Sequence, residues 1–314
     1  MALIGSMLPI PDKQTRLLVI APHPDDETIG AGGLLQQVRE AGGEVRIWLL
    51  TDGDNNPWPQ RWLERRLWIG AAERERWGRR RRNEVAQALA ALGIAPEQLE
   101  GFSWPDMGLT GRLKGQFAAM LDLLEVRLRA WCPNLVVLPD LGDRHPDHGA
   151  AHVLARLAMA RESLTPILLT YLVHGGAMAG AGEILKIGPV HQDAKRQAME
   201  AHASQTALSG TRMRQLVERP EAFTRVEIGR GSPSSYKLPW QPAPWLKPLL
   251  RLTLASPSGV RSWSWRRAPL IEQGQGQVML SSEVVATAGP HFVKLHMDLP
   301  SPWIFDVWGW HEIS

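Results

Sequence analysis

The stretch Leu17-Leu18-Val19-Ile20-Ala21-Pro22-His23-Pro24-Asp25-Asp26-Glu27 decides how this chain folds. Its first four residues form a short apolar run, which is typical of a buried parallel strand. An imidazole and adjacent carboxylates follow at the carboxyl end of that strand, where open α/β sheets bind their ligands. One histidine and two aspartates can together provide metal ligands and a general base.

A second segment of similar character lies far downstream. Asp143-Arg144-His145-Pro146-Asp147-His148 follows another strand-like run, Leu135-Val136-Val137-Leu138-Pro139. Either segment alone is also explained as a loop in which proline fixes the turn and aspartate caps a helix. If both strands lie in one parallel sheet, their carboxyl ends point to the same edge. The two segments together therefore favour a functional site.

Strand-like and helix-like segments alternate through the first two thirds of the chain. The expected strands are 16–21, 44–51, 100–104, 135–139 and 167–173, and the expected helices are 30–41, 72–92, 113–131, 148–160 and 193–207. This alternation predicts an α/β fold with a doubly wound, Rossmann-like, mostly parallel sheet. After residue 220 the composition shifts to Pro, Ser, Trp and Gly, and short β-like patterns follow, so we expect a small β-rich C-terminal appendage.

Cysteine content and hydropathy limit the classes of protein to which this chain can belong. The 314 residues contain one cysteine, Cys132. A single cysteine excludes an internal disulfide framework and a thiolate-rich metal site, and it fits a reducing compartment. No run of eighteen apolar residues occurs, and the N-terminus lacks the features of a signal peptide. We therefore expect a cytoplasmic protein.

Positive charge is concentrated in one part of the sequence. Between residues 61 and 82, nine arginines stand against three glutamates, an excess of six, whereas the whole chain carries a formal charge of +3. Such a segment is either a solvated helical face or a site that attracts a phosphate, a diphosphate or an anionic membrane surface. Peripheral contact with the inner face of the membrane is therefore an open alternative. We expect no nucleic acid partner, because no known binding motif accompanies the charge.

Tryptophan is unusually frequent, with 14 residues against two tyrosines and five phenylalanines. Its wide apolar face can stack on a sugar ring, although it more often fills a core. Trp58, Trp62 and Trp68 follow the acidic end of the second expected strand. A role in facing a sugar therefore competes with simple packing for these three residues.

The two motifs resemble the signature of the PIG-L/LmbE-type zinc-dependent de-N-acetylases, a family of N-acetylglucosaminyl deacetylases. The resemblance rests on His23-Pro24-Asp25-Asp26-Glu27 and His145-Pro146-Asp147-His148. Lesser matches are Arg81-Arg82-Asn83-Glu84, Trp104-Pro105-Asp106-Met107-Gly108, Lys195 and His202-Ala203-Ser204-Gln205. The resemblance covers about residues 15–210. It implies a metal-dependent deacetylase domain at 15–215, followed by a Pro/Trp/Ser-rich linker or cap at 216–250 and the β-rich appendage at 251–314.

The resemblance also implies roles for individual residues. The metal ligands are His23, Asp26 and His148, and the metal is Zn²⁺, with Fe²⁺ left open because ferrous iron suits the same ligands. Asp25 is then the general base that takes a proton from metal-bound water. His145 stabilises the oxyanion as an imidazolium, and either His145 or Asp25 protonates the leaving amine.

Further residues are expected around this centre. By resemblance, Asp106 binds sugar hydroxyls and Arg81 binds an anionic aglycone. Asp143 and Asp147 either orient the imidazoles or cap the following helix. His202 is expected to give structural support only.

The expected activity is metal-dependent hydrolysis of an N-acetyl group from an N-acetylglucosamine-like sugar. The sugar belongs to a glycolipid, a glycan precursor or a small glycoside, so the expected partner is an N-acetylated saccharide or glycolipid, which is anionic if the basic segment binds it. Two alternatives stay open. One is a zinc amidase that cuts a larger sugar conjugate, and the other is a non-catalytic carbohydrate-binding protein on the same fold.

Overall fold

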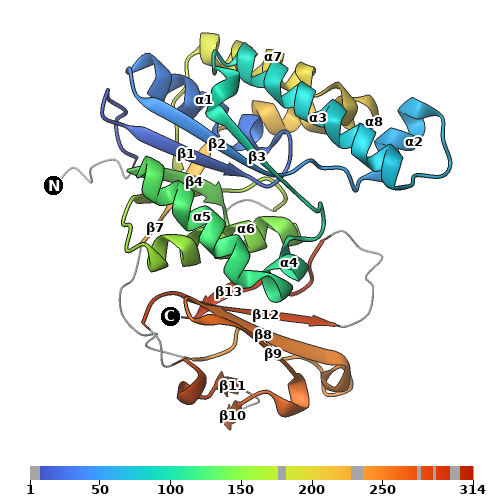
Figure 1. Cartoon of the computed structure of the whole chain (residues 1–314), viewed down its shortest axis with the longest axis vertical. Helices are drawn as coiled ribbons and strands as arrows, with labels where there is room; N and C mark the ends of the chain where they lie inside the picture. The colour runs from blue at the N-terminus through green and yellow to red at the C-terminus, as the bar shows by residue number, and fades with distance from the viewer. Residues whose placement is uncertain are drawn as a thin grey trace. The chain divides into compact units, whose positions relative to one another are not determined.

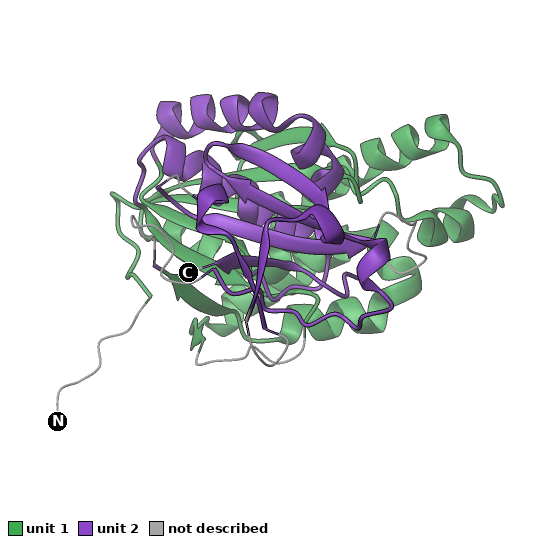
Figure 2. Cartoon of the chain, turned by 90° about the horizontal axis from the view of Figure 1, so that it is seen from below, with its two compact units in different colours: residues 1–108, 133–140, 166–226 green, residues 109–132, 141–165, 227–314 purple. Residues whose placement is uncertain are grey.

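The computed structural model describes residues 8–175, 182–227, 236–273, 277–285, 288–297 and 305–313. The chain divides into two compact units, which Figure 2 colours green and purple. The first unit comprises residues 1–108, 133–140 and 166–226, and the second comprises 109–132, 141–165 and 227–314. The domain boundaries expected near residues 215 and 250 stay a prediction.

The first unit is built on a seven-stranded, mostly parallel sheet, which confirms the expected fold class (Figure 1). In spatial order the strands are β3 (Leu99–Trp104), β2 (Glu44–Thr51), β1 (Arg16–Ala21), β4 (Leu135–Pro139), β5 (Ile167–Tyr171), β7 (Ala222–Val226) and β6 (Glu183–Ile184). Strand β1 pairs in parallel with β2 on one side and with β4 on the other. The strand order reverses between β1 and β4, and this is where doubly wound sheets bind ligands.

The helices of the first unit gather on one face of this sheet (Figure 1). They are α1 (Asp26–Glu40), α3 (Ala71–Ala91), α7 (Pro189–Ala201) and α8 (Ala203–Glu218), with the short α2 (Pro57–Glu64) beside α8 and a 3-10 turn at Pro96–Gln98. Helix α1 packs closely because Gly30 faces Tyr171 of β5, where an added Cβ would lie 2.4 Å from the ring. The apolar faces of strands and helices form one buried core, which includes Leu17, Val19 and Val137.

The second unit combines helices with an antiparallel sheet. Its helices are α4 (Leu109–Gly115), α5 (Phe117–Trp131) and α6 (Pro146–Arg161), and 3-10 turns lie at Lys247–Leu249, Trp265–Arg267 and Ser282–Val284. The strands form a four-stranded sheet in the order β13 (Trp310–Ile313), β12 (His291–Met297), β8 (Leu250–Ser256) and β9 (Gly259–Ser264), and a hairpin of β10 (Leu270–Gln273) with β11 (Gln277–Leu280). The β-rich C-terminal region is thereby confirmed.

Several details differ from the sequence prediction, and strands β6 and β7 of the main sheet are among those not expected. The helix expected at 193–207 is two helices, because His202 between them has ψ 54°, which is not helical. The helix expected at 113–131 is also two, since Gln116 takes φ −133° between α4 and α5. Helix α2 was not expected at all. Across the described residues, no helix is long and apolar enough to cross a membrane.

Candidate active site

The loop after β1 surrounds His23 with carboxylates. The Nδ1 atom of His23 lies 3.3 Å from Asp26 Oδ2, and its Nε2 atom lies 3.3 Å from Asp106 Oδ1. The backbone N–H of His23 also donates to Asp26 Oδ2 at 2.8 Å. All three side chains are buried. The ring of His23 is therefore held between one carboxylate of its own loop and one from the loop after β3.

Asp106 is held in its ionised form. Burial by itself would raise the pKa of Asp106, but the hydrogen bond and charge of His23, the backbone N–H of Asn55 and the charge of Arg81 outweigh it and lower the pKa. The Asn55 N–H donates to Asp106 Oδ2 at 2.9 Å. Both carboxylate oxygens of Asp106 thus contact other protein groups.

Asp25 is strained and electrostatically perturbed. Its φ of 115° lies in the left-handed region, which costs free energy in a residue other than glycine. Burial raises the pKa of Asp25 to about 6; Arg81 and His202 oppose the shift, and the charges of Asp26 and Glu27 add to it. A carboxyl group with such a pKa can exchange protons near neutral pH, as a general base must.

Arg81 of α3 ties two strand-end loops together beside Asp25. Its guanidinium donates to the carbonyl oxygen of Pro24 at 2.6 Å and to that of Gly53 at 2.7 Å. Its Nη2 atom lies 3.4 Å from Asp25 Oδ2, and the side chain is only 4% exposed. The guanidinium of Arg81 therefore contacts both strand-end loops and lies near Asp25, and its expected contact with an anionic aglycone stays a prediction.

A buried pair of Glu27 and His202 supports the same loop, and sequence reasoning missed it. The Nε2 atom of His202 lies 3.2 Å from Glu27 Oε1, and the backbone N–H of Asp25 donates to Glu27 Oε2 at 3.1 Å. Burial alone would lower the pKa of His202, but the hydrogen bond and charge of Glu27, with the charge of Asp25, raise it. The motif that begins at His202 was the signal that could have revealed this pair.

In the second unit, two histidines lie at the start of α6, with His145 as the N-cap residue and His148 in the first turn. The Nδ1 atom of His148 lies 3.0 Å from Asp143 Oδ2, and both side chains are fully buried. A carboxylate on one ring nitrogen is the usual support for a histidine that binds a metal through the other. Of the two roles considered for Asp143, the structure therefore favours orienting the imidazole.

His145 caps helix α6. Its Nδ1 atom accepts a hydrogen bond from the backbone N–H of Asp147 at 3.3 Å, and its ring centroid lies 5.1 Å from that of His148. An accepting Nδ1 indicates the neutral tautomer with the proton on Nε2, an assignment made from the contacts. Asp147 in turn accepts from the backbone N–H of Leu109 at 3.0 Å, which anchors the start of α4.

The structure brings His23, Asp25, Asp26, Arg81 and Asp106 together in the first unit, and His145 with His148 in the second. The first group lies where β1, β2 and β3 end. The second group follows the end of β4, which is the hydrogen-bonded neighbour of β1.

Comparison with known proteins finds a family model that matches part of the chain. Residues 18–159 match the family model described as PIG-L, GlcNAc-PI de-N-acetylase. A 1D-myo-inositol 2-acetamido-2-deoxy-alpha-D-glucopyranoside deacetylase of Rhodococcus erythropolis is 32% identical over 164 residues, which are 46% of this chain and 52% of the relative. The enzyme of the same name from Corynebacterium kroppenstedtii is 30% identical over 161 residues, 46% of this chain and 40% of the relative. The chain spans about half the length of the curated relatives that it matches.

Solved structures share the fold. The zinc-inhibited form of a teicoplanin deacetylase aligns with a TM-score of 0.54 at 18% identity, over 68% of this chain and 99% of the other. An N,N'-diacetylchitobiose deacetylase from Pyrococcus horikoshii aligns with a TM-score of 0.52 at 22% identity, over 68% of this chain and 84% of the other. At these identities the similarity establishes the fold.

Proposed function

We propose, on the premise that residues 18–159 of this chain belong to the PIG-L family, that the protein hydrolyses an N-acetyl group from an N-acetylglucosamine-like sugar. The observation that carries the proposal is the set of His23, Asp25 and Asp26 directly after β1, of which Asp25 is partly buried and the other two are buried. These side chains combine two metal-ligand types with a separate proton acceptor. The curated relatives are named as deacetylases of an inositol glycoside of 2-acetamido-2-deoxyglucose, which supports a small glycoside as substrate.

The proposed metal ligands are His23, Asp26 and His148. His23 presents Nδ1 towards Asp26, while Asp106 contacts Nε2. Asp143 contacts Nδ1 of His148 and so orients the ring, which leaves Nε2 as the atom proposed to bind the metal. The donor types, two imidazoles and one carboxylate, fit zinc, and ferrous iron is the alternative.

Chain connectivity supports the joining of these residues. Strands β1 and β4 pair in parallel, so their carboxyl ends share one edge of the sheet. His23 follows the last residue of β1, Ala21, by two positions, and His148 follows the last residue of β4, Pro139, by nine. An extended chain advances at most about 3.3–3.6 Å per residue. The nine positions after Pro139 therefore limit the distance between His148 and that edge of the sheet.

The proton chemistry is assigned to this chain's own residues. A divalent cation would supply Lewis-acid chemistry, which lowers the pKa of water and polarises a carbonyl group. Asp25 takes the proton from the attacking water, and Arg81 and Glu27 fix its position through the contacts described above. His145 donates from Nε2 to the oxyanion as a neutral imidazole, because its Nδ1 already accepts the N–H of Asp147.

We propose positioning roles for Asp106 and Arg81. Asp106 orients the ring of His23 and Arg81 orients Asp25, since the polar atoms of both side chains are buried against protein groups. The contacts of Asp106 with sugar hydroxyls and of Arg81 with an anionic aglycone, expected from the sequence, stay predictions.

The test is release of free amine and acetate from a panel of N-acetylglucosamine glycosides, with and without added zinc. We expect turnover that a chelator abolishes, and none in Asp25→Asn. Release of larger acyl groups with no acetate would favour the zinc amidase instead. Sugar binding without release of amine would favour a carbohydrate-binding protein.

A further inference from the structure

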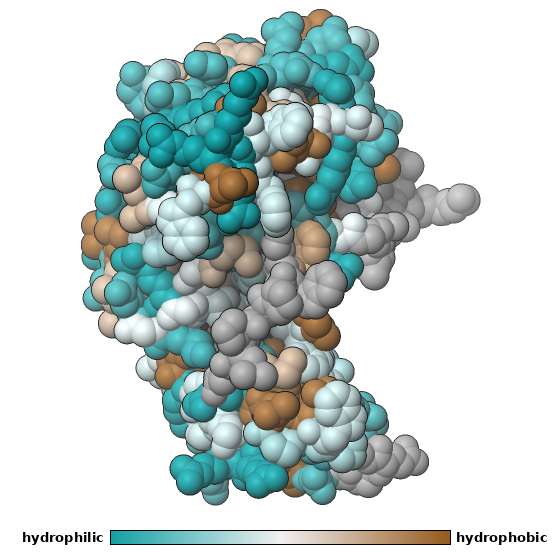
Figure 3. All heavy atoms as spheres, turned by 90° about the vertical axis from the view of Figure 1, so that its right-hand side faces the viewer, coloured by the Kyte–Doolittle hydropathy of each residue, from teal (hydrophilic) through white to brown (hydrophobic). Residues whose placement is uncertain are grey.

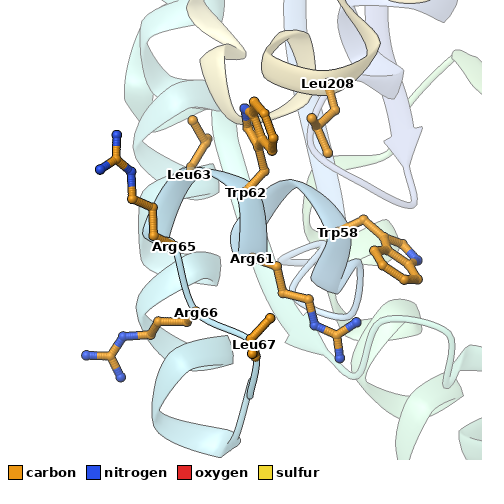
Figure 4. Close-up of a pocket in the computed structure, with 8 residues that line it drawn as sticks. All are labelled: Trp58, Arg61, Trp62, Leu63, Arg65, Arg66, Leu67 and Leu208. Carbon is orange, nitrogen blue, oxygen red and sulfur yellow. The ribbon is translucent and has the colours of Figure 1, made fainter.

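Helix α2 and the loop after it expose an unusual combination of side chains. A hollow of about 730 Å³ is lined by two tryptophans, three arginines and three leucines (Figure 4). We call six of these residues the tryptophan–arginine patch: Trp58, Arg61, Trp62, Arg65, Arg66 and Leu67. Figure 4 shows Trp62 beside Leu208 of α8, with Trp58 and Arg61 projecting away from that helix.

The apolar members of the patch are largely exposed. Trp58 is 64% exposed, Trp62 66% and Leu67 92%. Trp68, next in the chain, is 83% exposed. Figure 3 looks onto this side of the first unit, where pale and brown side chains lie among hydrophilic ones. Large exposed apolar clusters surrounded by polar groups often mark interaction surfaces.

The charge of the patch is not neutralised within it. Of the nine arginines from 61 to 82, six form ion pairs with carboxylates, namely Arg66, Arg76, Arg79, Arg80, Arg81 and Arg82. Across the part of the chain that the structure describes, Arg61, Arg65 and Arg74 form none, and the first two of these line the hollow. No acidic residue lines the hollow. The solvated-face interpretation of the basic segment therefore accounts for most of its arginines but not for these three, two of which belong to the patch.

Arginine and tryptophan also meet directly. The guanidinium carbon of Arg61 lies 5.0 Å from the centroid of the Trp58 ring, within cation–π range. The exposed ring of Trp58 and the guanidinium of Arg61, which forms no ion pair among the described residues, therefore lie side by side at the surface.

We propose that the tryptophan–arginine patch binds the surface of an anionic lipid bilayer. Tryptophan favours the interface between headgroups and acyl chains, and arginine is attracted to anionic headgroups. A neutral sugar could stack on the tryptophan rings but would carry no negative charge to pair with the arginines. Charge complementarity therefore favours the anionic lipid surface.

The position of the patch connects it to the candidate active site. Helix α2 begins at Pro57, two residues after Asn55, whose N–H binds the Asp106 carboxylate beside His23. Docking of α2 on a bilayer would bring this rim of the site to the lipid surface. The inference goes beyond the proposed hydrolysis, because the binding it describes does not require turnover.

The test is flotation of the full-length protein with vesicles of phosphatidylcholine, with and without phosphatidylglycerol, at low and high salt. We expect binding only with the anionic lipid, weakened by salt. Arg61→Gln with Arg65→Gln should lower affinity about 25-fold, at about fivefold for each arginine. Trp58→Ala with Trp62→Ala should lower it by at least about tenfold. Trp245→Ala, which removes a tryptophan that is 73% exposed outside the patch, should bind as the unaltered protein does.

Circular dichroism melting of each variant shows whether it folds, and Leu67→Ser with Trp68→Ala provides a second patch variant outside α2. Absence of binding to anionic vesicles, or full binding by the arginine, the tryptophan and the Leu67/Trp68 double variants, would overturn the proposal. So would patch variants that bind vesicles normally but show a raised KM for a lipid-free glycoside, since the patch would then serve a saccharide. Asp25→Asn should bind vesicles normally even though it is inactive, which separates this inference from the proposed hydrolysis.

Discussion

Replacement of Asp25 by asparagine should abolish deacetylation and at the same time stabilise the metal-free protein. The pKa of Asp25 is raised from 3.8 to about 6, mainly by burial. Between its unfolded-state pKa and its higher folded-state pKa, the carboxyl group is protonated in the folded protein but ionised in the unfolded chain. The metal-free protein therefore loses stability as pH rises from about 4 to about 6, and the loss persists above that window.

The magnitude follows from the shift. About two pKa units correspond to about 3 kcal/mol in favour of a neutral side chain at pH 7. The charge of Arg81, which lies 3.4 Å from Asp25 Oδ2, opposes the shift and is already contained in this figure. Asparagine tolerates the left-handed backbone at φ 115° about as well as aspartate does. We therefore expect a gain of up to about 3 kcal/mol in the free energy of unfolding, together with a fall in kcat of at least about 100-fold.

Urea unfolding of chelator-treated protein at pH 4 and pH 7 measures the first effect, and amine release from an N-acetyl glycoside measures the second. Asp193→Asn is the matched control, because its side chain is 63% exposed and should change stability by less than about 0.5 kcal/mol. A variant Asp25→Asn that is less stable than the unaltered protein at pH 7, or that keeps its activity, would refute the reasoning.

Three other variants test the surrounding residues. His202→Gln should lower stability most below about pH 6.5 and progressively less as pH rises, because a raised histidine pKa stabilises the fold only while the ring is protonated; urea unfolding across this range checks it. Arg81→Lys should lower kcat at least about tenfold with little change in KM, since it disrupts the hold on Pro24 and Gly53; a raised KM for anionic glycosides alone would indicate substrate contact instead. Asp143→Asn should weaken metal affinity about 10–100-fold, measured by competition with a chelating dye, and unchanged affinity would argue against its support of His148.

Much of the fold could be predicted because it depends on local pattern. The apolar runs of β1 and β4 are short, bounded by proline, and followed by helices, which in a parallel sheet brings their ends to one edge. The helix breaks at Gln116 and His202 could not be predicted in this way, since neither residue is proline or glycine. Tertiary contacts, such as that of His202 with Glu27, override helix propensity there.

The sequence by itself determined which chemical groups this protein offers after β1 and β4, because strand ends and the residues that follow them are adjacent in the chain. Tertiary structure alone decided what several of these groups do. Arg81 holds the carbonyls of Pro24 and Gly53, and Asp106 holds the ring of His23, across large separations in sequence. The raised pKa of Asp25 likewise arises from burial and from charges that include Arg81 and His202. Burial and long-range charge are properties of the packed chain, so no local pattern encodes them.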